Sequence, residues 1–355
     1  MAEILLRGLD WVSLNISFKN KSSLNRFTSE TSNLYEKRLH SRVSFLGRNW
    51  TKIPHHKLPG RFELVSIEGL LLDIYPYRSG CDYPLKIHLK KPYGNDVKTC
   101  PLWEKPFETL EFILADVANR FGEIDHNIGR VDLFCHFSRL TFKSKDLSRF
   151  RGLPRAPWEH DVKFTGFSFK NKRPKEKRVE ATIYDVNQRL ADNPSSFDPA
   201  PFYPQDKSTS NPWNLEFKVY KTYLQERGIN TIEDLKKLET IPSIWRGLTK
   251  DKVRLVVKSK DTNEARWKVN RHWVHIQKAF GEEFIPLKRI TSTPKKLSVP
   301  KIIKCIETYL VRLASECNIM HLSEEDRVRY LYGCFDINRF SNEEILKYRH
   351  QKGMS

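Results

Sequence analysis

A tyrosine that closes a predicted strand is the residue of this sequence best placed to do chemistry. In residues 178–189, RVEATIYDVNQR, apolar side chains alternate with Glu180, Thr182 and Tyr184. This alternation predicts a strand with one buried and one polar face. Tyr184 ends the polar face, beside acidic residues and after a run of lysines, so its phenol is placed to attack a phosphate. Packing at a strand end is the alternative role, which most of the 13 tyrosines must have.

Polar side chains on a second predicted strand point to a metal site. In residues 130–137, RVDLFCHF, Asp132 and His136 share one face, and apolar residues fill the other. We expect Asp132 and His136 to lie close enough along the strand for one ion to bridge them. A salt-bridged acid and a hydrogen-bonded sheet histidine are the alternatives. A third alternating segment, Trp213–Tyr220, places Glu216 on its polar face, where pairing with a Lys or Arg is the alternative to metal binding.

Basic residues cluster in the turn before Tyr184. Residues 162–169 and 178–184 are predicted to form a hairpin joined by the sequence NKRPKEK. The turn and its rim carry six cations, namely Lys170, Lys172, Arg173, Lys175, Lys177 and Arg178. We interpret them as a finger that grips DNA phosphates. A solvated loop is the alternative, because charge runs are common on exposed turns.

The composition of the chain favours a negatively charged partner. Its 355 residues include 62 Lys and Arg against 43 Asp and Glu, a formal net charge of +19. Such a field attracts polyanions, nucleic acid first and an anionic membrane surface second. No apolar run approaches the roughly 18 residues that a membrane span needs, and the N-terminus does not fit a secretion signal. We therefore expect a cytoplasmic protein without a membrane partner. The six cysteines form no CxxC pair, so we expect reduced thiols and no zinc site.

Periodicity predicts an α+β fold in two parts. Predicted strands cover residues 12–18, 61–75, 84–89, 130–137, 162–169, 178–184 and 213–220. A helix is predicted to begin at Pro106, and residues 20–60 carry few periodic signals. From about residue 240 the pattern is helical, including residues 241–257. We predict a curved, mostly antiparallel sheet flanked by helices in a catalytic domain of residues 1–238, and a helical C-terminal region in residues 239–355.

Four stretches of the chain are similar to one protein family. They are GRVDLFCHF, the pair TGFSF and ATIYDVNQRL, NPWNLEFKVYKTYLQERGINTIEDL, and IWRGLTKDKVRLVVKSKDTNEARWKVNRHW. In this order they resemble the replication initiation factors of rolling-circle plasmids and phages, the transesterase Rep group, which includes relatives used in conjugative mobilisation. The stretches fall within residues 128–280, with a weaker likeness at DWVSLNISF, which begins at Asp10. No motif is specific alone, and the order of all four carries the resemblance.

The resemblance implies a mechanism and a set of site residues. In such proteins a tyrosine attacks a DNA phosphodiester at the replication origin, keeps a 5′-phosphotyrosyl link and releases a 3′-OH that primes synthesis. A divalent cation, Mg²⁺ or Mn²⁺, polarises the scissile phosphate. By position, Tyr184 is the nucleophile, and Asp132 and Glu216 are metal ligands. His136 stands where the family often has a second Asp, and it would suit Mn²⁺ better than Mg²⁺.

The resemblance also implies partners and leaves alternatives open. Origin DNA is the implied substrate, and a host helicase and a second copy of the chain are the implied protein partners. Besides His136, two further positions depart from the family pattern: Val186 replaces a lysine expected two residues after the tyrosine, and Asn214 replaces an arginine near the strand glutamate. One alternative is a mobilisation relaxase of identical chemistry. The other is a DNA-binding protein of the same fold whose site has decayed.

Overall fold

The chain forms two compact units, Met1–Ile290 and Thr291–Ser355. The computed structural model describes residues 1–54, 62–66, 70–75, 83–90, 104–160, 163–170, 177–194, 198–204, 211–282 and 284–289, with 323, 325 and 326. Residues 239–290 belong to the first unit by their contacts. The helical C-terminal region predicted from residue 239 lies largely outside the described residues, so the division at residue 238 stays a prediction.

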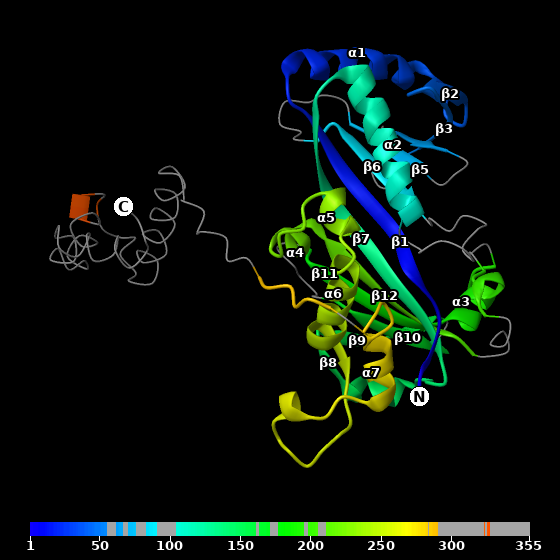
Figure 1. The fold of residues 1–355 in the computed structure, drawn as a ribbon, viewed down its shortest axis with the longest axis vertical. Helices are drawn as coiled ribbons and strands as arrows, with labels where there is room; N and C mark the ends of the chain where they lie inside the picture. Colours follow the sequence, from blue (N-terminus) through cyan, green and yellow to red (C-terminus); the bar gives the residue numbers. More distant parts are fainter. Residues whose placement is uncertain are drawn as a thin grey trace. The chain divides into compact units, whose positions relative to one another are not determined.

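One large sheet organises the first unit (Figure 1). Its eleven strands follow the spatial order β2 (Arg42–Phe45), β3 (Arg48–Pro54), β4 (Phe62–Val65), β5 (Leu70–Ile74), β6 (Leu85–Lys90), β1 (Glu3–Phe18), β7 (Ile124–Ser138), β12 (Trp213–Tyr220), β11 (Val179–Asp185), β10 (Lys163–Phe169) and β9 (Arg155–His160). Every strand pairing within the described residues is antiparallel. The predicted α+β class with a mostly antiparallel sheet is therefore confirmed.

Helices and a small second sheet complete the described part of the chain. The helices are α1 (Lys21–Glu36), α2 (Glu104–Phe121), α3 (Val186–Asp192), α4 (Lys221–Gln225), α5 (Ile232–Lys236), α6 (Thr240–Gly247) and α7 (Arg271–Gln277). Shorter turns are η1 (Ser144–Arg149), η2 (Ala200–Phe202), the π-helical η4 (Leu248–Lys252) and η5 (Glu264–Arg266). The second sheet pairs β8 (Phe150–Gly152) with β13 (Val253–Leu255). Within the described residues, no helix combines the length and apolar character that a membrane crossing requires.

Alternating side chains give the large sheet one apolar face and one polar face. On β7, Val131, Leu133 and Cys135 are fully buried, as their spacing predicts. They share a hydrophobic core with Phe107 and Leu110 of α2, which lies along the half of the sheet that contains β1 and β6 (Figure 1). The apolar face therefore holds the core, and the opposite face is left for polar side chains.

The second sheet corrects one prediction. Residues 241–257 are predicted to be helical, but α6 ends at Gly247 and, after the π-helical turn, residues 253–255 form a strand. Val253 and Leu255 are fully buried, while Arg254 between them is not. Three alternating residues are too few to override the helical spacing on either side, so the strand could not be recognised from local sequence.

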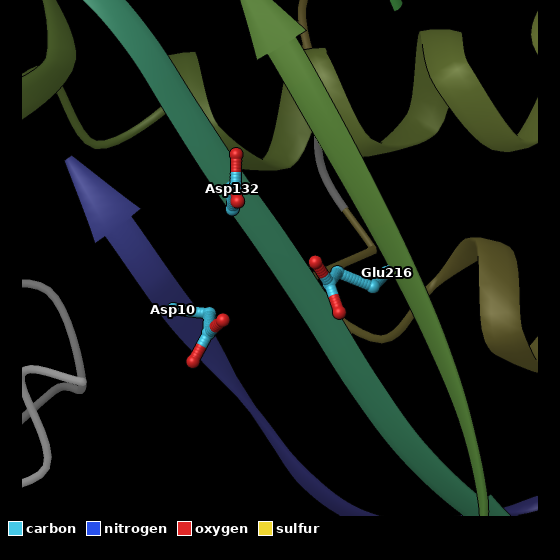
Figure 2. Close-up of side chains that lie close together, drawn as sticks. All are labelled: Asp10, Asp132 and Glu216. Atoms are coloured by element: carbon cyan, nitrogen blue, oxygen red, sulfur yellow. The ribbon is translucent and has the colours of Figure 1, made fainter. Parts of the chain in front are cut away.

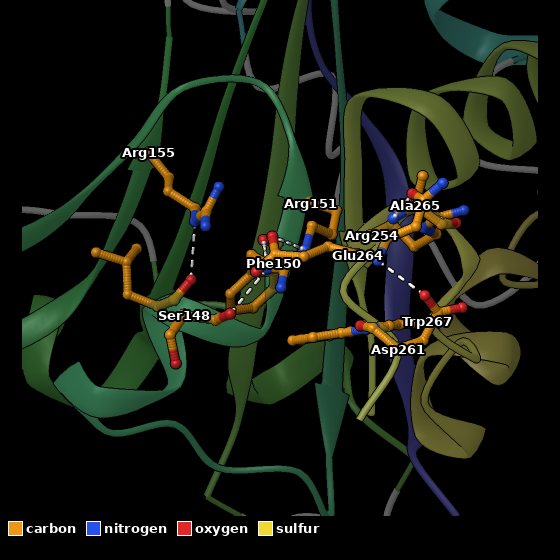
Figure 3. Close-up of polar contacts among 11 residues, drawn as sticks. Ser148, Phe150, Arg151, Arg155, Arg254, Asp261, Glu264, Ala265 and Trp267 are labelled. Atoms are coloured by element: carbon orange, nitrogen blue, oxygen red, sulfur yellow. Dashed lines mark hydrogen bonds and ion pairs between the residues drawn. The ribbon is translucent and has the colours of Figure 1, made fainter. Parts of the chain in front are cut away.

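The second sheet places two arginines directly opposite each other. Arg254 of β13 pairs with Arg151 of β8, and like charges across a ladder repel. Figure 3 shows how the neighbouring segment offsets this: Glu264 Oε2 lies 2.9 Å from Arg151 Nε, and the Ala265 carbonyl accepts a hydrogen bond from Arg254. The Arg151 guanidinium also lies 4.5 Å from the centre of the Trp267 ring. The pair is thus held by partners far along the chain.

A buried lysine anchors the end of α1 to the sheet. Lys52 of β3 is only 4% exposed, and its Nζ donates hydrogen bonds to the carbonyls of Leu34, Tyr35 and Lys37 at 2.7, 3.1 and 2.5 Å. The last carbonyls of a helix have no partner within the helix, and they carry the negative end of its dipole. One ammonium group therefore completes the hydrogen bonding of the α1 C-terminus.

We predict that Lys52→Met lowers the free energy of unfolding by about 2–3 kcal/mol, because three carbonyls lose their donor while the side-chain volume is kept. Urea unfolding followed by circular dichroism measures the change. Lys145→Met, at an exposed lysine of η1, serves as the matched control and should change stability by less than about 0.5 kcal/mol. Equal stabilities of the two variants would contradict the anchoring role.

Candidate active site

The polar face of the sheet brings together the strands that carry the predicted site residues. β7, β12 and β11 are neighbours, and their register aligns the residues of this face in three rows across the strands. The rows are His136–Asn214–Tyr184, Phe134–Glu216–Thr182 and Asp132–Lys218–Glu180. Glu216 is therefore a diagonal neighbour of both Asp132 and Tyr184, at roughly 7–8 Å between Cα atoms. Three segments far apart in the sequence thus form one surface.

Three carboxylates converge on this surface. Asp10, Asp132 and Glu216 each offer an oxygen, and these oxygens all lie within 4.8 Å of one another. Figure 2 shows the three side chains entering one space from β1, β7 and β12. Asp132 is 1% exposed and Glu216 is 7% exposed, so little water reaches their charges. Hard oxygen ligands at this spacing suit a divalent cation such as Mg²⁺ or Mn²⁺.

Asp10 reaches the cluster through an irregularity in β1. Leu9 pairs with Leu133, but the next pair along joins Trp11 to Asp132, so Asp10 is an extra residue in the ladder. Such a bulge lets two consecutive residues oppose one partner and redirects a side chain. Asp10 and Trp11 therefore both lie opposite Asp132. Sequence reasoning missed Asp10 as a ligand, although the weaker family likeness begins at this residue.

Nearby cations only partly neutralise the buried carboxylates. Both Nε and Nη2 of Arg130 donate hydrogen bonds to Asp132, the first at 2.6 Å. Burial nevertheless raises the pKa of Asp132 to about 7, Arg130 opposes that rise, and the charge of Glu216 adds to it. Burial also raises the pKa of Glu216, whose oxygen lies 3.7 Å from Lys218 Nζ. The cluster therefore holds more negative charge than its neighbours balance.

The donor set fits the cation that the family resemblance implies. An ionised carboxylate has about four lone-pair sites, so Asp132 can keep Arg130 and still offer an oxygen to an ion. Asp10, Asp132 and Glu216 would hold it. When bound, such an ion supplies charge that polarises a phosphate oxygen and offsets negative charge in the transition state. The fit rests on the spacing and burial of the three carboxylates.

His136 does not share this cluster, so the prediction that it binds the same ion is wrong. It lies four residues from Asp132 on the same strand, about 13 Å along the chain, which one ion cannot bridge. Its Nδ1 instead lies 2.7 Å from the hydroxyl oxygen of Tyr203. Burial, with the charge of Arg189, lowers the pKa of His136 to about 3, so the imidazole stays neutral. The alternative of a hydrogen-bonded sheet histidine describes it better.

Tyr184 lies on the polar face, one strand away from Glu216. It is 7% exposed, and its hydroxyl oxygen accepts a hydrogen bond of 2.7 Å from Nδ2 of Asn214. Burial raises the pKa of the phenol, the charge of Glu216 adds to the rise, and Arg189 and the Asn214 hydrogen bond oppose it. Asn214, which replaces the arginine of the family pattern, therefore contacts the predicted nucleophile directly.

The predicted basic finger is only partly within the described residues. Lys172, Arg173 and Lys175 lie outside them. Lys170 is exposed, Lys177 lies 3.6 Å from Glu180, and Arg178 Nη2 lies 2.9 Å from Glu226. These two contacts are exposed ion pairs, which are weak enough for a phosphate to compete with them. DNA binding by the finger stays a prediction.

Comparison with known proteins finds similarity at the level of structure. No protein-family model matches the chain, and no curated protein sequence matches it. Among solved structures, the chain is similar to the rolling circle replication initiator protein from Geobacillus stearothermophilus, with 14% sequence identity and a TM-score of 0.46. The match covers 80% of this chain and 99% of that chain.

We predict that, relative to Asp132→Asn, the metal-free wild-type protein loses stability as pH rises from 4 to 7. The buried neutral His136 contributes in the opposite direction, because its pKa is lowered, but it does so equally in both proteins. In this interval the unfolded chain has released the Asp132 proton, whose pKa is 3.8 there, while the folded protein retains it up to about pH 7. Folding then costs up to about 4 kcal/mol more at the upper end, since one pKa unit corresponds to about 1.4 kcal/mol. Urea unfolding in EDTA at several pH values measures the slope.

The difference in stability between wild type and Asp132→Asn should therefore change with pH, whereas the difference between wild type and Asp125→Asn, at an exposed position of the same strand, should stay constant. Mn²⁺ should raise the melting temperature more at pH 8 than at pH 5.5, because carboxylates must lose their protons to bind it. A Mn²⁺ effect that survives in Asp132→Asn at full size would contradict the assignment of the site.

Proposed function

We propose that this protein nicks and rejoins one strand of DNA at a replication origin, through a covalent bond between Tyr184 and a 5′-phosphate. The observation that supports this most is the shared surface: three converging carboxylates and a phenol lie on the polar face of one sheet, on four neighbouring strands. The order of the four family motifs and the net charge of +19 point to the same substrate.

The proposed chemistry is a transesterification in which no high-energy cofactor is needed. The Tyr184 hydroxyl oxygen attacks phosphorus, the bond from phosphorus to the 3′-oxygen breaks, and a phosphotyrosyl bond replaces it. Because one phosphodiester is exchanged for another, the bond energy is kept, and a later 3′-OH can reverse the step. Rolling-circle initiation uses this reversal to rejoin the displaced strand.

The surroundings of Tyr184 support a role for Asn214 as a positioning residue. Its amide donates a hydrogen bond to the phenol oxygen and so stabilises negative charge there. Burial keeps the phenol protonated in the free protein, since its pKa is raised. A cation at the three carboxylates and a phosphate beside the phenol would shift that balance toward the phenolate. The nucleophile would then be activated only when the substrate is present.

We predict that the protein converts supercoiled DNA carrying its own gene and flanking sequence into nicked and relaxed forms, with Mg²⁺ or Mn²⁺ present. Protease treatment after denaturation should leave a peptide on the 5′ end that contains residue 184. Tyr184→Phe should lower adduct formation by at least about 10⁴-fold, because no phenol oxygen remains to form the bond. Gel analysis of radiolabelled DNA measures both products.

Tyr220→Phe is the matched control, because Tyr220 lies on the same face at the end of β12 and donates a hydrogen bond to Glu180. It should keep wild-type nicking. If Tyr184→Phe nicks DNA as well as wild type does, Tyr184 is not the nucleophile. If wild type binds DNA with a steep salt dependence and never cleaves it, the chain is a DNA-binding relative with a decayed site, as the departures at Val186 and Asn214 would then indicate.

A further inference from the structure

An arginine that the family motifs do not include lies against the predicted nucleophile. Arg189 belongs to α3, which begins directly after β11, and its guanidinium carbon is 4.5 Å from the centre of the Tyr184 ring. The Asp185 side chain accepts a hydrogen bond of 3.0 Å from the Gln188 backbone and so caps α3 at the end of the strand. Arg189 is itself exposed to solvent. The guanidinium is therefore held at the nucleophile and open to a ligand.

The charge of Arg189 acts on three titratable groups around the nucleophile. It opposes the rise in pKa of Tyr184 and of Glu216, and it contributes to the lowered pKa of His136. The printed geometry places the guanidinium against the phenol ring, with its carbon 4.5 Å from the ring centre. A phosphate attacked by the phenol oxygen would therefore lie near this guanidinium.

Among the described residues, Arg189 differs from the other cations near this site because its side chain has no acidic partner. Arg130 is bound to Asp132, and Lys218 lies 3.7 Å from Glu216. The Arg189 guanidinium forms neither an ion pair nor a hydrogen bond within the described part of the chain, and it contacts the Tyr184 ring. Its N–H donors remain available, and their planar fork matches the oxygens of a phosphate.

The local sequence explains why a cation is needed at this point. The family pattern has a lysine two residues after the tyrosine, where this chain has Val186. Val186 is 4% exposed and packs as the first residue of α3. Arg189 lies three residues further on, and residues at this spacing are neighbours on one side of a helix. The chain thus places a cation on the helical turn next to the position where the lysine is missing.

We propose that Arg189 is a further catalytic residue, which binds the non-bridging oxygens of the scissile phosphate while Tyr184 attacks it. The inference rests on the proposed nicking function and names a residue of the same site. As the bond from the Tyr184 oxygen to phosphorus forms and the bond to the 3′-oxygen breaks, the phenol proton passes to water and the 3′-oxygen takes one from water. Arg189 keeps its protons throughout and offsets the charge that accumulates on the phosphorus oxygens.

The test compares a charged and an uncharged phosphate at the cleavage position. Once wild type has defined that position, two oligonucleotides are made, one with the natural phosphodiester and one with a methylphosphonate, which lacks the negative charge. Single-turnover rates of adduct formation are measured for wild type, Arg189→Ala and Arg189→Lys. Arg26→Ala, at an exposed arginine of α1, is the control for loss of a surface charge.

We expect Arg189→Ala to slow adduct formation about 10²-fold on the phosphodiester, the usual effect of removing one donor to a developing oxyanion. On the methylphosphonate the two proteins should react within about threefold of each other, because there is no charge to offset. Free guanidinium ion should restore part of the rate of Arg189→Ala on the phosphodiester, and Arg26→Ala should match wild type. The melting temperature of Arg189→Ala should stay close to that of wild type.

Equal losses on both substrates, or wild-type rates for Arg189→Ala on the phosphodiester, would overturn the role of Arg189 while leaving Tyr184 as the nucleophile. Absence of any wild-type adduct would overturn the nicking function and the role of Arg189 together. Whether the wild-type protein forms an adduct therefore distinguishes the two failures.

Discussion

The cost of removing carboxylates from water is the constraint on which the site depends. Asp132 and Glu216 are almost fully buried on the face of a sheet, with Asp10 within 4.8 Å. Burying ionised groups without full compensation is costly, and it is relieved by a proton, by paired cations or by a metal ion. Arg130 and Lys218 supply part of the compensation, and the raised pKa of Asp132 shows that it is incomplete. A divalent cation would balance the remaining negative charge of the three carboxylates.

The sheet makes this arrangement possible. Core packing on the apolar face sets which residues of neighbouring strands pair, and this pairing also fixes which side chains are neighbours on the polar face. Leu133 of β7 pairs with Phe217 of β12 in the core, so their neighbours Asp132 and Glu216 must emerge on the other side. A shift by one residue would bury the acids in the core and expose the apolar side chains. Core packing therefore holds the geometry of the site. The fold tolerates the buried carboxylates because the apolar side chains of the sheet fix its strand register.

Much of this could be predicted from the sequence because alternation is a local signal. The strands around Asp132, Tyr184 and Glu216 were recognised from period-two patterns, and so was the polar face that they share. The Thr231–Asp234 capping box at the start of α5 is a local signal of the same kind, since its residues are three apart. The helix α1 could not be predicted, because residues 21–36 are rich in serine, threonine and asparagine and form only a weak apolar stripe.

The features that escaped prediction depend on long-range pairing. The bulge that directs Asp10 to the cluster arises from the pairing of β1 with β7, which are separated by more than a hundred residues. His136 has the right residue type and the right face, but its distance from Asp132 along the strand removes it from the cluster. Arg189 stands outside the family pattern, and only the turn from β11 into α3 places it over the phenol.

The central claim is that one cation binds among Asp10, Asp132 and Glu216, beside Tyr184. The most direct measurement is anomalous diffraction at the manganese absorption edge from crystals grown with Mn²⁺. The account predicts an anomalous peak within about 2.5 Å of an oxygen of each of the three carboxylates. A strong peak elsewhere, or none at these carboxylates when Mn²⁺ saturates the protein, would contradict it.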